Sequence, residues 1–441
     1  MLLLSPRPLK RFKPLWLRLP IVGLSLLSPG LSQGADWSLK ANVDQSLGYD
    51  DNVRMVRQGQ PSQGPQGSFK YMLVPVLSFL HNTDVSEIRA TVSYGTQIYT
   101  DIPQFNQDIQ NYGLSGLYKT KNFDWGITTK YSITPSRNTA AQDSGNFNNN
   151  SDRNSWTVSP SISYKIDEVN SLMVSPSYSE TSYTTTASSS GGTDPNNNFR
   201  NNTTFNLNLG WQRLWTERYK TTTNLFYSMY EAQQTQTSQS PSPESVAPTS
   251  FDSVGINYSN VYEWSENWNL LGTVGIRHTE SNSNGNGNGN GNGNGNGNNS
   301  SSFGFLADVG VNYSGENFSS GLHFSRSLNP SSQGQLQEQT SIGLNFSYRI
   351  IERLSTSFAA NYQESTLVNS ISSSARKNIV IQPSISWQLT PELALGGSYR
   401  YRLQDGNTNN GIGTNANNGV ADSNLFMLTL NYNWQGFKLS R

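Results

Sequence analysis

His278 and Glu280 are the two side chains of this sequence whose types and spacing come nearest to catalytic chemistry. A hydrolase needs a histidine that is hydrogen-bonded to a nucleophile and oriented by a third group. The remaining histidines are His81, at a predicted short turn, and His323, on a different predicted strand. No HExxH, GxSxG or glycine-rich phosphate loop is present. A hydrolase is therefore our lowest-ranked hypothesis, and we expect that the protein is not an enzyme.

Asp50, Asp51 and Asn52 form a short acidic and amide stretch that could ligate calcium through oxygen atoms. Two or three oxygens do not fill a calcium shell, so a polar strand end that enters a loop is the favoured interpretation. Cysteine is absent, which excludes disulfides, thiolate metal sites and a cysteine nucleophile. We therefore expect no metal and no other cofactor.

Small polar side chains recur at every second position over long stretches, as in Thr157 to Ser163 and in Asn206 to Gln212. If they line a lumen, they leave room and offer hydrogen bonds without a strong fixed charge. Such a wall suits water and neutral or weakly charged saccharide better than an ion filter, although any wide barrel has a polar lining. Charged exceptions to this pattern include Glu87 and Arg89. The candidate pore-lining residues are Lys130, Lys165, Asn206, Asn208, Gln212, Arg277, Asn345, Arg349, Asn361, Arg400 and Arg402.

The elements that must position these side chains are strands, because apolar and polar residues alternate from Trp37 to Arg441 in about eighteen units. In one unit Thr340, Ile342, Leu344, Phe346, Tyr348 and Ile350 share one face, and Ser341, Gly343, Asn345, Ser347 and Arg349 share the other. One face is apolar and aromatic, and the other is mostly small and polar.

The connectors between units are alternately short and long, which distinguishes a membrane barrel from a soluble sandwich. The short ones are His81–Val85, Thr120–Asn122, Ile166–Val169, Thr216–Arg218, Ser265–Asn267, Ser314–Asn317, Ile351–Arg353 and Leu389–Glu392. The long ones are Asp51–Gln66, Thr100–Asp108, Pro135–Ser151, Thr184–Arg200, Ala232–Ser250, Thr279–Ser302, Asn329–Glu338, Thr366–Arg376 and Gln404–Asp422. The pattern predicts an all-β fold: a single transmembrane antiparallel up-and-down β-barrel of about 18 strands, with short periplasmic turns and long extracellular loops.

The composition agrees with an apolar belt that is one residue thick. Only 34% of the residues are hydrophobic and the mean hydropathy is −0.58, yet there are 10 Trp, 21 Tyr and 18 Phe. A globular chain this polar could scarcely bury a core over its whole length. Aromatic residues gather beside the short connectors, where an interfacial girdle is expected: Trp215, Tyr219, Trp264, Trp268, Tyr313, Phe318 and Trp387.

Residues 1–34 form a separate leader. It has five basic residues, a short apolar segment from Leu19 to Leu27, and the small residues Ser32 and Gly34 near its end. These features predict a secretory signal peptide at 1–34, followed by the barrel at 35–441. Without the leader, 25 basic and 30 acidic residues remain, so there is no basic field for nucleic acid. No apolar run is long enough for a transmembrane helix.

Two of the long connectors have biased compositions. The run from Asn284 to Gly297 alternates Asn and Gly, and Thr235 to Ser250 is rich in Ser, Gln and Pro. Such segments cannot bury apolar surface, so we expect flexible surface loops.

The end of the first unit carries a resemblance to a known family. Its residues Ser46-Leu47-Gly48-Tyr49-Asp50-Asp51-Asn52-Val53 resemble the opening strand of the β-barrel porin 2 family. That family is associated with exopolysaccharide gene clusters. The resemblance covers the predicted mature chain in architecture and about eight residues in motif. It implies a large barrel that moves or secures surface polysaccharide, and it supplies no catalytic residues.

The C-terminus departs from the usual pattern, in which a terminal aromatic residue is recognised by the barrel-assembly machinery. The last unit reaches Tyr432 and Trp434 and then continues through Phe437 to Arg441. Either the strand ends at Trp434 or it ends at Phe437.

The leading hypothesis is a pore in the Gram-negative outer membrane for passive diffusion or export of saccharide or exopolysaccharide. The alternative is a structural or adhesive surface barrel whose lumen is closed. Expected partners are outer-membrane lipid, the barrel-assembly machinery, and polysaccharide with its export components; nucleic acid is not expected.

Overall fold

The computed structural model describes residues 35–57, 65–140, 145, 147, 151–185, 199–233, 249–283, 298–368, 375–407 and 419–440. The predicted signal peptide at 1–34, the run from Asn284 to Gly297 and residues 234–248 lie outside the described residues. Among the residues that are described, no helix is both long enough and apolar enough to cross a membrane.

Eighteen antiparallel strands make up nearly all of the described chain, in agreement with the predicted number. Their bounds are β1 Asp36–Asp50, β2 Ser68–Asn82, β3 Ser86–Tyr99, β4 Gln107–Lys119, β5 Phe123–Pro135, β6 Ser151–Lys165, β7 Asn170–Thr185, β8 Asn202–Thr216, β9 Tyr219–Ala232, β10 Thr249–Glu263, β11 Trp268–Ser283, β12 Asn298–Ser314, β13 Phe318–Pro330, β14 Leu336–Ile351, β15 Leu354–Leu367, β16 Ala375–Gln388, β17 Leu393–Asn407 and β18 Gly419–Ser440. Two short 3-10 helices, η2 (Pro103–Phe105) and η3 (Ser136–Thr139), lie in the long connectors.

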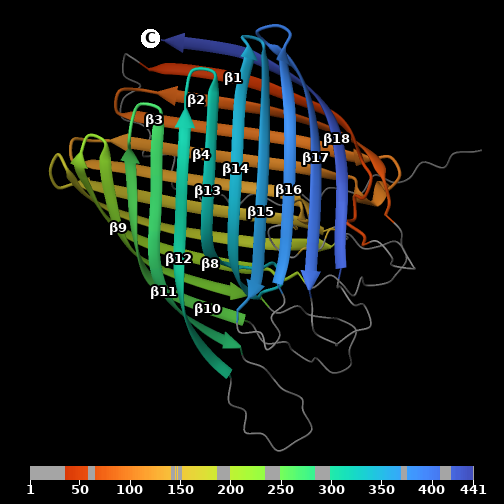
Figure 1. The fold of residues 1–441 in the computed structure, drawn as a ribbon. Coiled ribbons are helices and arrows are strands. Elements are labelled where there is room, and N and C mark those ends of the chain that lie inside the picture. Colours follow the sequence, from red (N-terminus) through yellow and green to blue (C-terminus); the bar gives the residue numbers. More distant parts are fainter. Residues whose placement is uncertain are drawn as a thin grey trace, which may run out of the picture.

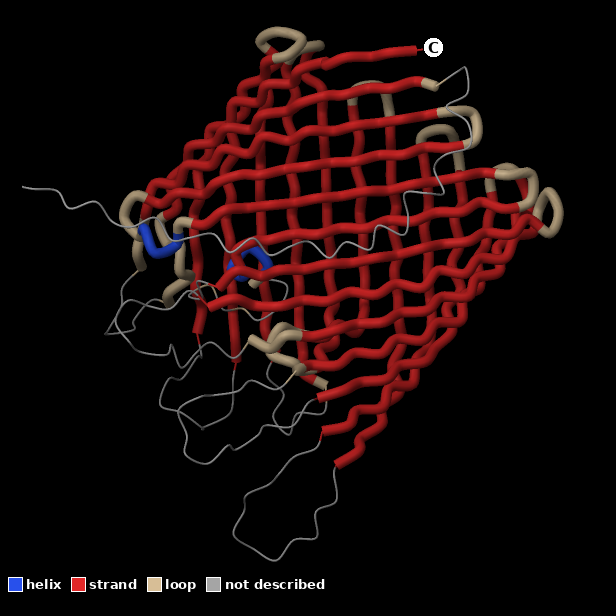
Figure 2. Tube along the Cα trace, turned by 180° about the vertical axis from the view of Figure 1, so that it is seen from behind, coloured by secondary structure: helices blue, strands red, loops and turns tan. Residues whose placement is uncertain are grey.

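The strands close into one barrel. Each strand pairs with its neighbours in sequence, and β1 pairs with both β2 and β18, so the sheet has no free side edge (Figure 1). Asp36 lies opposite both Asn82 and Ser440. The first residue of β1 and the last residue of β18 therefore both lie at the end of the barrel that carries the short turns. Figure 2 shows the same single wall from behind. Closure satisfies the backbone groups that lipid could not satisfy.

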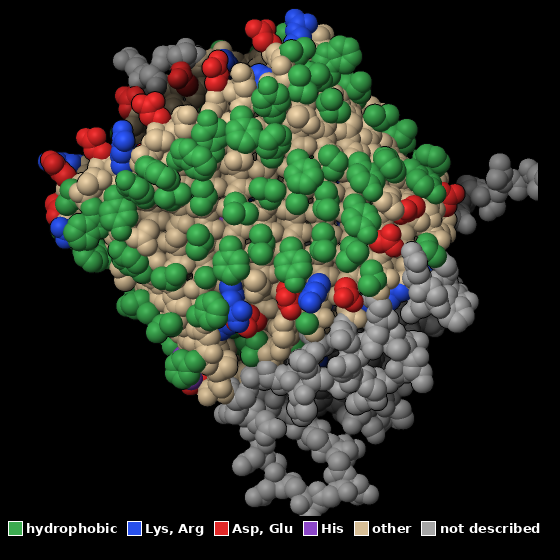
Figure 3. All heavy atoms as spheres, in the orientation of Figure 1, with side chains coloured by type: hydrophobic (Ala, Val, Ile, Leu, Met, Phe, Trp, Pro, Cys, Tyr) green, Lys and Arg blue, Asp and Glu red, His purple; other side chains and the backbone are tan. Residues whose placement is uncertain are grey.

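The two faces of the wall have opposite character, as the alternation predicts. Large apolar side chains point outward and are exposed, including Leu47 (54% exposed), Ile276 (63%) and Leu428 (62%). Figure 3 shows apolar side chains distributed across a broad band of one face of the wall, with charged side chains mostly toward its margins. At the short-turn end the Tyr313 ring centroid lies 5.0 Å from that of Trp268 and 5.5 Å from that of Phe318. The closed ladder and the apolar belt are those of an outer-membrane β-barrel.

The short turns are closed by side chains that bond the backbone. Thr83 Oγ1 accepts a hydrogen bond from the Ser86 amide (2.9 Å), and Thr120 Oγ1 accepts one from the Phe123 amide (2.9 Å). Asp167 accepts bonds from the Asn170 side chain and from the Val169 amide, and these bonds hold the pKa of the Asp167 carboxyl below its usual range. Thr, Ser and Asp at the first turn position therefore fix the register of the hairpins.

Several strand boundaries differ from the sequence prediction, most of all between β11 and β12. The connector predicted at Thr279–Ser302 is shorter, because β11 runs on to Ser283 and β12 begins at Asn298. The residues paired there are all polar, so the apolar–polar alternation that predicts a strand is missing although the backbone hydrogen bonds continue. The prediction that His81 lies in a short turn is also wrong: it is on β2, where its ring stacks on Trp37 at 4.1 Å.

The last strand ends at neither predicted residue. β18 continues to Ser440, with Trp434 opposite Ala41 and Phe437 opposite Leu39, and the ladder shifts register between these pairs. Gly436 has φ +70°, and a Cβ there would lie 1.5 Å from the carbonyl oxygen of Leu39. This bulge changes the side-chain alternation, so that Phe437 and Leu439 rejoin the outward face.

Candidate functional site

The register places the candidate pore-lining residues on strand positions that alternate with the outward-facing ones, that is, on the inner side of the wall. Lys130 lies between Thr129 and the exposed Tyr131, and Asn208 lies between Leu207 and the exposed Leu209. The same holds for Lys165, Asn206, Gln212, Arg277, Asn345, Arg349, Asn361, Arg400 and Arg402. Two of the charged side chains are neutralised locally: Lys165 pairs with Asp124 (3.0 Å), and Arg277 interacts with Glu338 (3.5 Å).

The inner wall carries hydroxyl pairs that bridge neighbouring strands. Thr157 donates to Ser179 (3.1 Å) between β6 and β7, and the hydroxyls of Ser325 and Ser341 lie 2.7 Å apart between β13 and β14. Similar pairs join Ser159 to Ser177, Thr273 to Ser259 and Ser253 to Thr279. A hydroxyl can both donate and accept, so each pair keeps capacity for water or for a sugar hydroxyl.

Three long connectors fold into the lumen near the extracellular end. Val53 follows β1, Ile102 and Phe105 follow β3, and together with Tyr99 they form a buried apolar cluster. The second cluster joins Met55 to Ala140 and Phe147 of the β5–β6 connector and to Ala421 on β18. Apolar side chains of these connectors are thus covered by one another and by strand residues.

The β5–β6 connector reaches the opposite part of the wall. Gln404 on β17 donates to the Gly145 carbonyl (3.0 Å), and the Arg402 guanidinium lies 4.9 Å from the Phe147 ring centroid. Around the closed wall five strands (β4, β3, β2, β1 and β18) separate β5 from β17, so the connector crosses part of the lumen. The connector therefore narrows the passage at this level.

Four cationic side chains meet beneath these connectors, and we call Lys70, Arg137, Arg400 and Arg402 the cationic cluster. Lys70 interacts electrostatically with each of the other three and with Asp50. Arg137 is 5% exposed, and its guanidinium lies 4.5 Å from the Tyr99 ring centroid. Burial lowers the pKa of Arg137 from its ordinary value, while Tyr99 and Asp50 act in the opposite direction; an arginine stays charged under these conditions.

The Asp50-Asp51-Asn52 stretch ties β1 to β18. Asp50 accepts from the Ser423 hydroxyl (2.7 Å), and Asp51 accepts from both the amide and the side chain of Asn424 (2.7 Å each). Asn52 donates to the carbonyls of Val56 and Asp422. These oxygens are used as acceptors at the seam of the barrel, which supports the interpretation as a strand end over the calcium hypothesis.

A second inward structure is formed by the tip of the β13–β14 hairpin. The Ser331 carbonyl accepts from Tyr230 Oη on β9 (3.2 Å), and the Ser332 carbonyl accepts from the Arg200 amide (2.8 Å). Leu336 packs with Tyr230, Ala232 and Phe251 in a third buried cluster. The tip leaves β12, whose pairing with β13 stops at the pair Ala307 and Arg326.

Charged side chains bridge the resulting separation between β12 and β13. Glu338 contacts Arg326 at 2.7 Å and Arg277 at 3.5 Å, and Arg277 is only 5% exposed. A Cβ on Gly304 would lie 2.5 Å from Nη1 of Arg277, so the glycine leaves space for the guanidinium. Arg277 is thus a buried link within the wall, while its position on the inner side agrees with the alternation.

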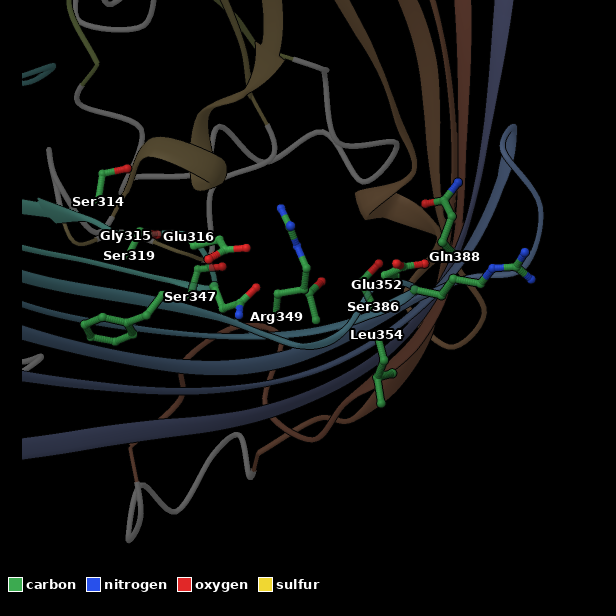
Figure 4. Close-up of a pocket in the computed structure, with 14 residues that line it drawn as sticks. Ser314, Gly315, Glu316, Ser319, Ser347, Arg349, Glu352, Leu354, Ser386 and Gln388 are labelled. Carbon is green, nitrogen blue, oxygen red and sulfur yellow. The ribbon is translucent and has the colours of Figure 1, made fainter. Parts of the chain in front are cut away.

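A cavity of about 460 Å³ lies at the opposite, short-turn end. Its walls come from the β12–β13 turn, the β14–β15 turn and the end of β16 (Figure 4). The Arg349 side chain points into the interior of the barrel in this view, with Glu316 and Glu352 nearby. The cavity carries both charge signs and lies along one sector of the wall at the short-turn end.

The described residues around His278 do not assemble a hydrolase site. The ring lies 4.5 Å from the Phe303 ring on the outer face, and Nε2 is 3.4 Å from Glu280. Nδ1 has no hydrogen-bond partner among the described residues, so no described nucleophile is bound to it. Across the same residues, no group of three or more His, Asp or Glu side chains is placed to hold a metal ion.

Comparison with known proteins gives similarity of fold only. No protein-family model matches the sequence, and no curated protein matches it. Similar solved structures include the FrpB iron transporter from Neisseria meningitidis (9% identity, covering 90% of this chain and 81% of that chain, TM-score 0.47). OccAB3 from Acinetobacter baumannii is 11% identical over 91% of this chain and 99% of that chain, with a TM-score of 0.44. OccK5 from Pseudomonas aeruginosa is 11% identical over 90% and 98%, with a TM-score of 0.43. At these values the likeness carries no argument about function.

Proposed function

We propose that the protein is an outer-membrane channel for saccharide, acting in passive diffusion or in export. The observation that supports this most is the recurrence of hydroxyl and amide side chains on the inner side of many strands within one closed wall. Sugars present many hydroxyls, and a lining of weakly polar groups can exchange hydrogen bonds with them as they move. The resemblance of the Tyr49-Asp50-Asp51-Asn52 stretch to the β-barrel porin 2 family points to the same class of solute.

Reconstitution in a planar lipid bilayer tests the proposal. We expect stable conductance steps, and we expect soluble oligosaccharides to interrupt the current while they occupy the lumen. A silent membrane, obtained with protein that shows heat-modifiable migration of a folded barrel on a detergent gel, would overturn the proposal.

The second candidate is a structural or adhesive surface barrel with a closed lumen. The two apolar clusters that contain connector residues favour it, because buried apolar contacts hold these connectors against the wall. The same bilayer experiment separates the two candidates, since a closed barrel is folded and silent whereas a channel is folded and conducting.

A further inference from the structure

We propose that the cationic cluster is a binding site for anionic groups (carboxylate, sulfate or phosphate) carried by the solute, so that the channel selects acidic saccharides. This inference rests on the proposed function for its saccharide part. It differs from the expectation of a neutral or weakly charged solute, which considered each strand separately.

The cluster gathers side chains from distant parts of the sequence around one point of the lumen. Lys70 Nζ lies 5.7 Å from the Tyr99 ring centroid, and Arg137 lies 4.5 Å from the same ring. Arg137 also lies 4.4 Å from the Phe105 ring. Arg400 and Arg402 approach from β17, across the β1–β18 seam.

The acid within the cluster cannot neutralise it. Asp50 is a single carboxylate beside three arginines and Lys70, and its Oδ1 already accepts from Ser423 and from the Asn52 amide. Elsewhere in the described wall, Arg89 pairs with Glu87 and Lys165 pairs with Asp124. Positive charge in the cluster therefore exceeds local negative charge, in a chain that carries a net negative charge outside its leader.

Arg400 and Arg402 are partly exposed on the inner side of the wall, whereas Arg137 is buried and donates through Nη2 to the Phe105 carbonyl (2.8 Å). Arg137 therefore adds positive charge to the cluster, and the guanidinium groups of Arg400 and Arg402 are those that a solute can reach. Arg400 donates through Nε to Gln382 (2.8 Å), which orients its guanidinium. Planar guanidinium groups match carboxylate, sulfate and phosphate oxygens with two parallel hydrogen bonds, and a low-dielectric wall strengthens the attraction.

The position of the cluster gives it influence over passage. It lies at the level where η3 and the Phe147 segment narrow the lumen, so a solute that passes comes close to the guanidinium groups. An anionic group is attracted there, and a cationic solute is repelled.

Isothermal titration calorimetry on the detergent-solubilised barrel tests the site without any need for conduction. The probes are a trimer of galacturonic acid and the neutral trimer maltotriose. We expect the uronate to bind at least 10-fold more tightly than maltotriose. The double variant Arg400→Gln/Arg402→Gln should weaken uronate binding at least 10-fold, and added inorganic phosphate should compete with the uronate in the unmodified protein.

Two further variants control the experiment. Lys377→Gln removes a positive charge from the outward face of β16 and should leave uronate binding unchanged. Asp50→Asn keeps an acceptor but removes the negative charge, so it should strengthen uronate binding. Equal affinity for the two trimers, or an affinity that neither Arg402→Gln nor Asp50→Asn changes, would overturn the inference.

Reversal potentials in a potassium chloride gradient then distinguish this inference from the proposed function. A channel that prefers chloride supports both, and a conducting channel without that preference contradicts the inference alone. A silent membrane with intact uronate binding contradicts the channel and leaves the anion site established.

Discussion

At the residue scale, polar side chains serve two different purposes in this barrel. Asp51 and Asn52 have their hydrogen-bonding atoms engaged by β18 and the adjoining backbone, so they hold the structure. Arg400 and Arg402 are partly exposed on the inner side of β17, so their guanidinium groups are available for a ligand. Hydrogen bonding and exposure together, and not residue type, separate the structural from the functional group.

Asn52→Ala should destabilise the barrel. The substitution removes bonds to Val56 and Asp422, and a typical hydrogen bond contributes about 1 kcal/mol, so we expect a loss on the order of 3 kcal/mol. The measurement is the temperature at which the folded band on a detergent gel converts to the unfolded band. Asn154→Ala, which removes one exposed bond to Thr184, is the control, and equal midpoints for the two variants would contradict the structural role.

At the element scale, the two irregular places in the ladder have identifiable causes. The β1–β18 seam shifts register at Gly436, which restores an apolar outward face at the end of the chain. The β12–β13 pairing stops early because the β13–β14 tip turns inward to Tyr230, and the separation is bridged by Glu338. A bulge, or pairing that stops before the strand ends, changes the direction of a strand locally and leaves the rest of the barrel closed.

Gly436→Ala should impair closure of the barrel. A Cβ would clash with the Leu39 carbonyl, and a positive φ costs an alanine roughly 1 kcal/mol or more before that clash is counted. We expect less heat-modifiable protein in the outer-membrane fraction. Gly113→Ala is the matched control, because no atom lies within 4 Å of the added Cβ. Normal assembly of both variants would show that the bulge is not required.

Glu338→Gln should loosen the β13–β14 tip. Removing the acid leaves Arg277 buried without its charge partner, and breaking a buried pair costs about 3–5 kcal/mol, less here because Glu338 is 25% exposed. Amide hydrogen exchange at Ser331 to Leu336 should accelerate. Glu87→Gln breaks the exposed pair with Arg89 and should have little effect on exchange there, in line with the small contribution of surface pairs. If exchange in Glu338→Gln is unchanged, the tip is stabilised by its apolar contacts and not by the Glu338 ion pairs.

At the scale of the whole molecule, the barrel is a closed wall of strands that separates the inner polar side chains and the connectors from lipid. Every strand pairs with a sequence neighbour except at the β1–β18 closure, so the wall forms from hairpins and one long-range seam. The connectors then pack inside, where the β5–β6 segment contacts β17. The lumen is therefore shaped by connectors as well as by strands.

Phe147→Ala combined with Gln404→Ala should increase single-channel conductance. The two substitutions remove the contact with Arg402 and the bond to Gly145 that hold the β5–β6 connector across the lumen. Phe303→Ala, on an outward-facing and 84% exposed side chain, is the control and should leave conductance unchanged. A conductance unaffected by the inner pair would mean that the connector does not limit the passage.

Most of the wall could be predicted from the sequence. Alternation, the short and long connectors and the aromatic girdle gave the strand number, the faces and the inner position of residues such as Asn208 and Arg402. The strand ends were less accurate in β11 and β12, where polar residues continue the ladder. The Thr, Ser and Asp residues that begin the short turns are a signal in the sequence that would have placed His81 on its strand.

The sequence by itself determined which residues face lipid and which face inward, because a strand has period two and lipid tolerates only apolar side chains over the belt. Only the tertiary structure decided that Arg137, Arg400 and Arg402 lie close enough to Lys70 to interact with it electrostatically. Their proximity depends on closure between β1 and β18 and on a connector that crosses the lumen. Neither contact has a local signal, since each joins residues that are hundreds of positions apart and is selected by packing inside the closed wall.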